Sequence, residues 1–91
     1  MTYLNEVDMF TLDTIRKNLI DAINRSGMSQ TEIADKLHIK RQSFRQYLTG
    51  RAMPALDTFA NLCAILDVEA DYILGLIDIE GKKTYDINDL K

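Results

Sequence analysis

The sequence is poor in the residues that bind metals or cross-link chains. Its 91 residues include one cysteine, Cys63, and one histidine, His38. A single cysteine cannot form a disulfide within the chain, and this is typical of a reducing compartment, so we expect a cytoplasmic protein. Metal sites need several His, Cys or carboxylate ligands at set spacings, so we expect no metal ion and no other cofactor. Cys63 lies in the apolar segment NLCAIL and is interpreted as a small core residue.

Long apolar runs are also missing. No segment approaches the roughly 18 consecutive apolar residues of a membrane helix, so we expect no membrane partner. The first ten residues, MTYLNEVDMF, have no basic start and no long apolar stretch, unlike a secretory signal. A chain of this length has room for one small domain. It contains no glycine-rich phosphate loop and no nucleophile with a basic partner, so we predict neither an enzyme nor a small-molecule ligand.

Positive charge is scarce overall but concentrated in one part of the chain. The net charge of −3 does not by itself favour a nucleic-acid partner. However, residues 14–51 hold eight Lys and Arg against three Asp and Glu, a net of +5, whereas the segments before and after are net −3 and −5. Because binding to phosphate depends on the local field of one face, this distribution predicts a basic face with an acidic back.

Apolar residues recur at helical spacing through most of the chain, and this pattern predicts an all-α, compact five-helix bundle. The expected helices span about residues 12–25, 30–37, 40–49, 56–66 and 69–74. The buried face of the first is expected to contain Leu12, Ile15, Leu19, Ala22 and Ile23. That of the fourth is expected to contain Leu56, Phe59, Ala60, Leu62, Cys63 and Leu66.

Capping residues mark the helix ends. Thr11 or Asp13 is expected to cap the first helix, and Gly27 to end it by taking a positive φ. Ser29 is a suitable N-cap for the second helix, and Glu32 three residues later completes a capping box. These signals support the predicted boundaries.

The segment from Gln30 to Gly50, QTEIADKLHIKRQSFRQYLTG, is the most informative part of the chain. It reads as two short amphipathic helices joined by a tight turn. The second helix leaves polar and basic side chains pointing outward: Lys40, Arg41, Gln42, Arg45 and Gln46. Arginine and glutamine can pair bidentately with the major-groove edges of guanine and adenine, so this helix is expected to enter DNA.

The segment resembles the helix-turn-helix of the Cro/lambda-repressor (XRE-like) regulators. Upstream, IRKNLIDAINRSGMSQ resembles the first helix of that family and its Gly-x-Ser-Gln entry to the second. Downstream, GRAMPALDTFANLCAILDVEADYILGL resembles its Gly-x-x-x-Pro loop, fourth helix and closing helix. The resemblance implies a lambda-repressor-like DNA-binding domain over residues 12–76, with a lead-in at 1–11 and a short C-terminal extension, the tail, at 77–91.

The resemblance also implies a function. It indicates a sequence-specific regulator of transcription that binds double-stranded DNA, a repressor of prophage or mobile-element type, with the helix 40–49 in the major groove. Carried over by position, the base contacts are Arg41, Gln42, Arg45 and Gln46, and the phosphate contacts are Gln30, Lys40, Ser43, Thr49 and Arg51. For Arg45 and Gln46, contact with phosphate or water is the alternative. For Arg16, Lys17 and Lys36, contact with phosphate is the alternative to an ordinary surface charge, and we favour the surface charge.

Two departures from the family pattern bear on the fold. Many members pair a buried Arg in the first helix with a Glu near the end of the third, and the matching positions here are Ile23 and Leu48. Since both partners are apolar, no lone buried charge results. His38 stands where the turn commonly has glycine, so we expect it to take a positive φ, which histidine tolerates.

The tail leaves two structures open: a small hairpin, or an extension that ends in a short helix from Thr84. Homodimers of the family bind inverted repeats whose half-sites lie about 34–36 Å apart. Residues in and after the last helix are the candidates for the dimer contact, or alternatively complete the monomer core: Leu74, Leu76, Ile77 and Ile79.

A second class of function is a protein-interaction module, antitoxin-like or an adaptor, built on the same fold. The acidic C-terminal half, net −5, would serve such contacts because it cannot attract phosphate. At the other end of the chain, Glu6 and Asp8 argue against an N-terminal arm that wraps DNA.

Overall fold

The computed structural model describes residues 10–90, which form five α-helices and one short 3-10 helix. In chain order these are α2 (Leu12–Ser26), α3 (Gln30–Leu37), α4 (Arg41–Thr49), α5 (Leu56–Leu66), α6 (Ala70–Leu74) and η1 (Ile87–Leu90). The predicted all-α five-helix class is therefore confirmed. Residues 1–9, with most of the expected lead-in and both Glu6 and Asp8, lie outside the described residues.

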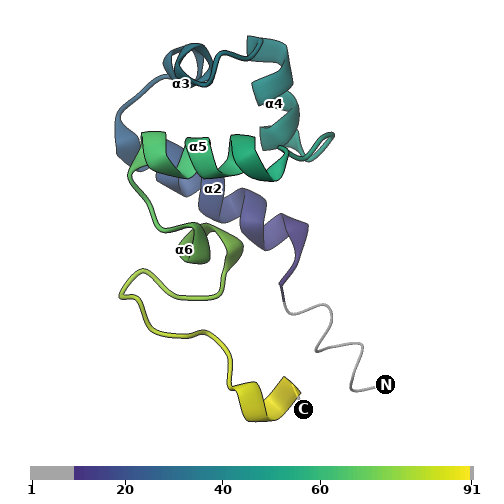
Figure 1. Ribbon diagram of the computed structural model, residues 1–91, viewed down its shortest axis with the longest axis vertical. Helices are drawn as coiled ribbons and strands as arrows, with labels where there is room; N and C mark the ends of the chain where they lie inside the picture. The colour runs from purple at the N-terminus through teal and green to yellow at the C-terminus, as the bar shows by residue number, and fades with distance from the viewer. Residues whose placement is uncertain (1–9, 91) are drawn as a thin grey trace.

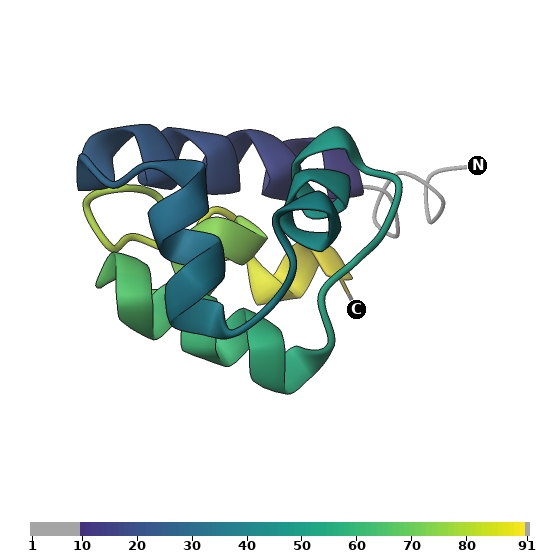
Figure 2. The same cartoon turned by 90° about the horizontal axis from the view of Figure 1, so that it is seen from above.

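The helices are arranged so that α3 and α4 lie at one end of the molecule (Figure 1). α2 is the longest helix and contacts α4, α5 and α6, while α3 contacts α4 and α5. α6 and the tail lie at the opposite end, away from α3 and α4 (Figure 1). Viewed from above, α3 crosses between α2 and α5 (Figure 2). Helices α3 and α4 are thus separated from the tail in space as well as in sequence.

Four fully buried side chains from four different helices form the centre of the core. They are Ile33 of α3, Phe44 of α4, Leu62 of α5 and Ile73 of α6, each 0% exposed. Full burial of such a side chain contributes about 1.5–3 kcal/mol, so these contacts hold the short helices together. Cys63 is buried beside them, and burial raises the pKa of its thiol, as expected of a core residue that stays protonated.

Two leucines that periodicity assigned to the core lie on the surface, so that prediction was wrong. Leu12 is 56% exposed and Leu56 is 87% exposed, and Ala60 is exposed as well. Leu12 and Leu56 are the first residues of α2 and α5. Periodicity gives the direction of a side chain on its own helix, but it does not tell whether a neighbouring helix extends far enough to cover the first turn.

The N-caps of α2 and α3 follow the sequence, but the predicted capping box is half formed, because no hydrogen bond within residues 10–90 joins the Glu32 carboxylate to the Ser29 N–H. The hydroxyl of Thr11 accepts a hydrogen bond from the N–H of Thr14 at 3.2 Å, and α2 ends at Gly27 with φ of 74°. The hydroxyl of Ser29 accepts one from the N–H of Glu32 at 3.0 Å, which makes it the N-cap of α3. The positive φ of Gly27 is the conformation that glycine adopts without strain.

Replacing Ser29 with alanine is expected to lower the free energy of unfolding by about 1 kcal/mol. The substitution removes the acceptor for the Glu32 N–H and leaves the core unchanged. Urea unfolding followed by circular dichroism measures the loss. Ser29→Asp keeps a capping oxygen and should restore most of the stability, so equal losses in the two variants would contradict the cap.

The tail contains both of the structures that the sequence left open. Ile77 and Lys83 form an antiparallel bridge, and the N–H of Asp78 donates to the carbonyl of Lys82 at 2.8 Å, which closes a small hairpin. The 3-10 helix η1 follows, starting at Ile87 rather than at Thr84. The hairpin is held to the domain by Thr84, whose N–H donates to the carbonyl of Leu76 at 3.1 Å.

Candidate nucleic-acid interface

The turn between α3 and α4 is set by two residues of the sequence. His38 has φ of 58°, which confirms the expected left-handed conformation, and its N–H closes the end of α3 on the carbonyls of Ala34 and Asp35. Lys40 is extended, with φ of −69° and ψ of 144°, so α4 begins at Arg41, one residue later than predicted. Burial of Ile33 and Phe44 then fixes the two helices against the core.

The outward side of α4 carries most of the predicted contact residues on a single surface, which we call the α4 face. A shallow hollow there is lined by Arg41, Gln42, Arg45, Gln46, Thr49 and Arg51. All four predicted base contacts are in this set, because positions four residues apart lie on the same side of a helix. Arg41, Gln42 and Arg45 are exposed, whereas Gln46 is half-buried.

A second hollow joins the α4 face to the start of α3. It is lined by Gln30, Thr31, Arg41, Arg45, Leu48 and Thr49. Gln30 is the first residue of α3, so the predicted phosphate contact lies at a helix N-terminus, where free N–H groups favour anions. Thr31 was not among the predicted residues. In the sequence, its hydroxyl on the first turn of a helix cannot be told apart from that of any threonine that faces solvent.

Two of the predicted phosphate contacts lie outside both hollows. Lys40 is the exposed N-cap of α4, and Ser43 is half-buried on the same helix. The structure does not bring either into the set formed by Arg41, Arg45 and Thr49. Contact of Lys40 and Ser43 with phosphate stays a prediction.

The positive charges of the α4 face form no ion pair with any residue between 10 and 90. Within residues 10–90, the ion pairs join Arg16 to Asp13 at 3.2 Å and Arg25 to Asp21 at 3.1 Å, both on α2. Arg41, Arg45 and Arg51 take part in neither. Their guanidinium groups can therefore bind an external anion or base edge without first breaking an ion pair to the part of the chain that the structure describes.

Arg16 is the residue of this region that sequence reasoning assigned wrongly. It was interpreted as an ordinary surface charge, but its Nη1 donates a hydrogen bond to the carbonyl oxygen of Thr49 at 3.1 Å. This contact links α2 to the end of α4 across 33 residues of sequence. Local patterns carry no signal for it, since it depends on how the two helices dock. Lys17 and Lys36 are exposed, in agreement with the interpretation given to them.

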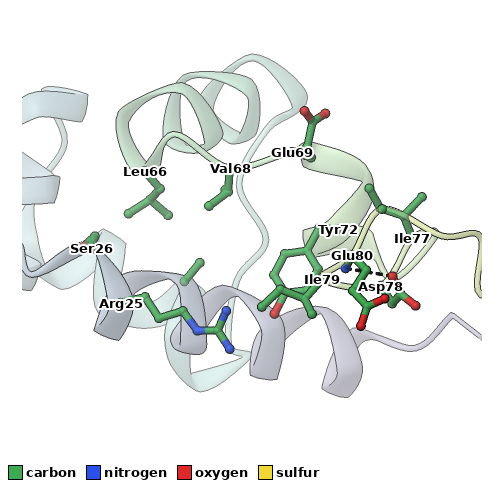
Figure 3. A pocket seen from close by; sticks show the side chains of 12 residues that line it. Arg25, Ser26, Leu66, Val68, Glu69, Tyr72, Ile77, Asp78, Ile79 and Glu80 are labelled. Atoms are coloured by element: carbon green, nitrogen blue, oxygen red, sulfur yellow. Dashed lines mark hydrogen bonds between the residues drawn. The ribbon is translucent and has the colours of Figure 1, made fainter.

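A third hollow lies at the other end of the molecule, between the end of α2, the α5–α6 junction and the hairpin. Figure 3 shows Leu66 and Val68 at one end, with Tyr72, Ile77 and Ile79 at the other. Of the proposed dimer residues, Ile79 is 62% exposed, whereas Leu74, Leu76 and Ile77 are half-buried. Three of the four residues therefore help to complete the monomer. Of the four, Ile79 has the largest exposed fraction.

Other kinds of site find no support in the part of the chain that the structure describes. Residues 10–90 contain no group of three or more His, Cys, Asp or Glu side chains that could hold a metal ion. In the same residues, every helix is too short or too polar to cross a membrane.

Comparison with known proteins gives a family and several relatives. The family model described as helix-turn-helix matches residues 19–73. HTH-type transcriptional regulator ImmR of Bacillus subtilis (strain 168) is 30% identical over 74 residues, which cover 81% of this chain and 58% of that protein. The SPbeta prophage-derived uncharacterized HTH-type transcriptional regulator YonR of the same organism is 44% identical over 48 residues, covering 53% of this chain and 44% of YonR.

A third relative, the uncharacterized HTH-type transcriptional regulator YqaE of Bacillus subtilis (strain 168), is 36% identical over 58 residues. These cover 64% of this chain and 50% of YqaE. The chain thus spans about half the length of the curated relatives it matches. No solved structure matches it.

Proposed function

This chain belongs to the helix-turn-helix family, and from that premise we propose that it is a sequence-specific regulator of transcription that binds double-stranded DNA. The observation that carries the proposal is the α4 face, where Arg41, Gln42, Arg45 and Gln46 gather on one exposed side of a helix anchored by Phe44. Relatives named as transcriptional regulators, one of them prophage-derived, support a repressor of prophage type. We place its action in the cytoplasm, with the DNA.

In the proposed complex, α4 lies in the major groove and reads bases with Arg41, Gln42, Arg45 and Gln46. Gln30, Lys40, Ser43, Thr49 and Arg51 surround them and bind phosphate, which fixes the register of the protein on the duplex. The proposed function requires only reversible binding to DNA and no catalytic step. Affinity should depend steeply on salt, since phosphate contacts release counterions.

The proposal is tested by selection from a randomised pool of DNA duplexes at moderate salt. We expect enrichment of an inverted repeat whose half-sites lie about one helical turn, or 34–36 Å, apart. Weak, salt-sensitive binding without enrichment would contradict sequence-specific regulation and would favour the protein-interaction module instead. The same experiment therefore separates the two functions.

We propose that the protein binds such a repeat as a homodimer, in which Leu74, Leu76, Ile77 and Ile79 contribute to the contact. Leu74 is the last residue of α6, and the other three follow it in and around the hairpin. Because α6 and the tail lie away from α3 and α4 (Figure 1), a contact there would not cover the α4 face. Ile79, at 62% exposure, supplies the apolar area that the partner would cover.

Replacing Ile79 with serine is expected to raise the dissociation constant of the dimer roughly tenfold or more, because a buried Ile contributes about 1.5–3 kcal/mol. Sedimentation equilibrium measures the change. Leu12→Ser is the matched control, since Leu12 is similarly exposed, at 56%, and is outside the proposed contact. An Ile79→Ser variant that dimerises like the wild type would remove Ile79 from the interface.

A further inference from the structure

Helix α4 has a glycine C-cap, Gly50, but no side-chain N-cap and no charged residue of its own that complements either end of its dipole. Its N-cap, Lys40, makes no side-chain hydrogen bond to the helix, its first turn has no acidic residue, and its last turn has no basic residue. A helix C-terminus carries a partial negative charge and leaves carbonyl oxygens without partners inside the helix. At the end of α4, the N–H groups of the following turn close on the carbonyl of Gln46, so the carbonyl of Thr49 is the one that takes a partner from elsewhere in the fold.

Arg16 of α2 supplies the missing cation. Its Nη1 donates to the carbonyl oxygen of Thr49, the last residue of α4, at 3.1 Å. Its Nη2 is 3.2 Å from Oδ1 of Asp13, one turn earlier on α2. A charged donor makes a stronger hydrogen bond than a neutral one, and the carboxylate on the other side holds the guanidinium in place.

The same guanidinium packs against the turn that follows α4. A Cβ atom added to Gly50 would lie 3.3 Å from Nη1 of Arg16, so the side chain fits closely over the glycine. In this turn the N–H groups of Gly50, Arg51 and Ala52 all donate to the carbonyl oxygen of Gln46. Arg16 thus lies against the segment that leads to Arg51, a predicted phosphate contact.

We propose that Arg16 is a positioning residue for the α4 face. It fixes the end of α4 and the turn at 50–52 relative to α2, and so holds Arg51 in register with Arg41 and Arg45. The DNA part of this inference rests on the proposed function. Direct contact of Arg16 with phosphate is disfavoured, because the carboxylate of Asp13 is 3.2 Å from the guanidinium and would repel a phosphate group.

The first test needs no DNA. Amide hydrogen exchange is measured for the full chain as wild type, Arg16→Gln and Arg16→Lys, with Lys17→Gln as the control that removes one positive charge from a neighbouring exposed position of α2. In Arg16→Gln, we expect the amides of Gly50, Arg51 and Ala52 to exchange roughly three- to tenfold faster. Core amides such as those of Ile33 and Leu62 should keep their wild-type rates.

The Arg16→Lys variant retains the charge but not the planar fork, so its rates at the turn should lie between those of wild type and Arg16→Gln. Wild-type rates at residues 50–52 in Arg16→Gln would overturn the proposal. So would an equal acceleration at all amides, since that would indicate a general loss of stability rather than positioning of one turn.

The second test compares binding to the selected duplex and to a scrambled one over a range of salt concentrations. We expect Arg16→Gln to lower the ratio of the two affinities by roughly three- to tenfold, with an unchanged slope of log affinity against log salt. An equal loss of affinity for both duplexes, with the slope of log affinity against log salt reduced by about one, would identify Arg16 as a phosphate contact. That result would overturn the proposal that Arg16 is a positioning residue. If the wild type selects no duplex, the proposed function fails, and hydrogen exchange alone decides on Arg16.

Discussion

The Phe44→Ala variant is expected to have a free energy of unfolding about 3–5 kcal/mol lower than the wild type. Phe44 is 0% exposed and meets Tyr47 edge-on, with their ring centroids 6.4 Å apart. Its removal leaves a cavity where α4 packs against α2 and α3, in the core cluster that also contains Ile33 and Leu62. The free energy of unfolding of a small domain is only about 5–15 kcal/mol, so this single substitution removes a large part of it. Urea unfolding monitored by circular dichroism measures it.

Leu56→Ala provides the control for this prediction. Leu56 is the residue that periodicity placed in the core and that is 87% exposed. Its replacement should change the free energy of unfolding by no more than about 0.5 kcal/mol. A loss at Leu56 comparable to that at Phe44 would mean that the first turn of α5 is covered in solution.

The Arg41→Ala variant is expected to lose its preference at one base position in each half-site of the selected repeat. An arginine bidentate to guanine contributes about 1–3 kcal/mol of discrimination, which is roughly a factor of 5 to 150 in affinity. Arg41 suits this role because it is exposed at the first position of α4 and lines both hollows of the α4 face. Selection from the same duplex pool with the variant reads out the relaxed position.

Lys40→Ala is the matched control, since it removes the neighbouring positive charge from the N-cap of α4. If Lys40 binds phosphate, as proposed, this variant should weaken binding to all sequences about equally and reduce the salt slope by about one. If Arg41→Ala weakened binding to all sequences equally and Lys40→Ala relaxed the sequence preference, then Lys40 would be the base contact and Arg41 the phosphate contact. Unchanged selection by Arg41→Ala would remove Arg41 from the base contacts.

The local parts of the fold were predictable because their causes are local. Thr11 and Ser29 cap helices through bonds to residues three positions away, and Gly27 and His38 take the left-handed conformation at helix ends. Such contacts form within one turn, so the sequence around them is sufficient to predict them. The α4 face was predictable for the same reason, since helical spacing alone places Arg41 and Arg45 on one side.

Contacts between distant segments were not predictable in this way. The hydrogen bond from Arg16 to Thr49 spans 33 residues, and those from the side-chain amide of Asn18 to the carbonyls of Tyr72 and Ile73 span 54 and 55. Each depends on the angle and offset at which α2 docks against another helix. These are set by the shape of the whole core, and no window of neighbouring residues contains that information.

Residue patterns were enough to predict the class of fold, most helix ends and the outward side of α4, because helical periodicity and capping act over a few residues. Tertiary structure alone decided which helix ends are covered, and so left Leu12 and Leu56 on the surface. It also decided that Arg16 caps α4 and that Ile79 is the most exposed of the four dimer candidates. Burial and long-range hydrogen bonds depend on which residues are neighbours in space, and these neighbours are fixed only when the helices dock.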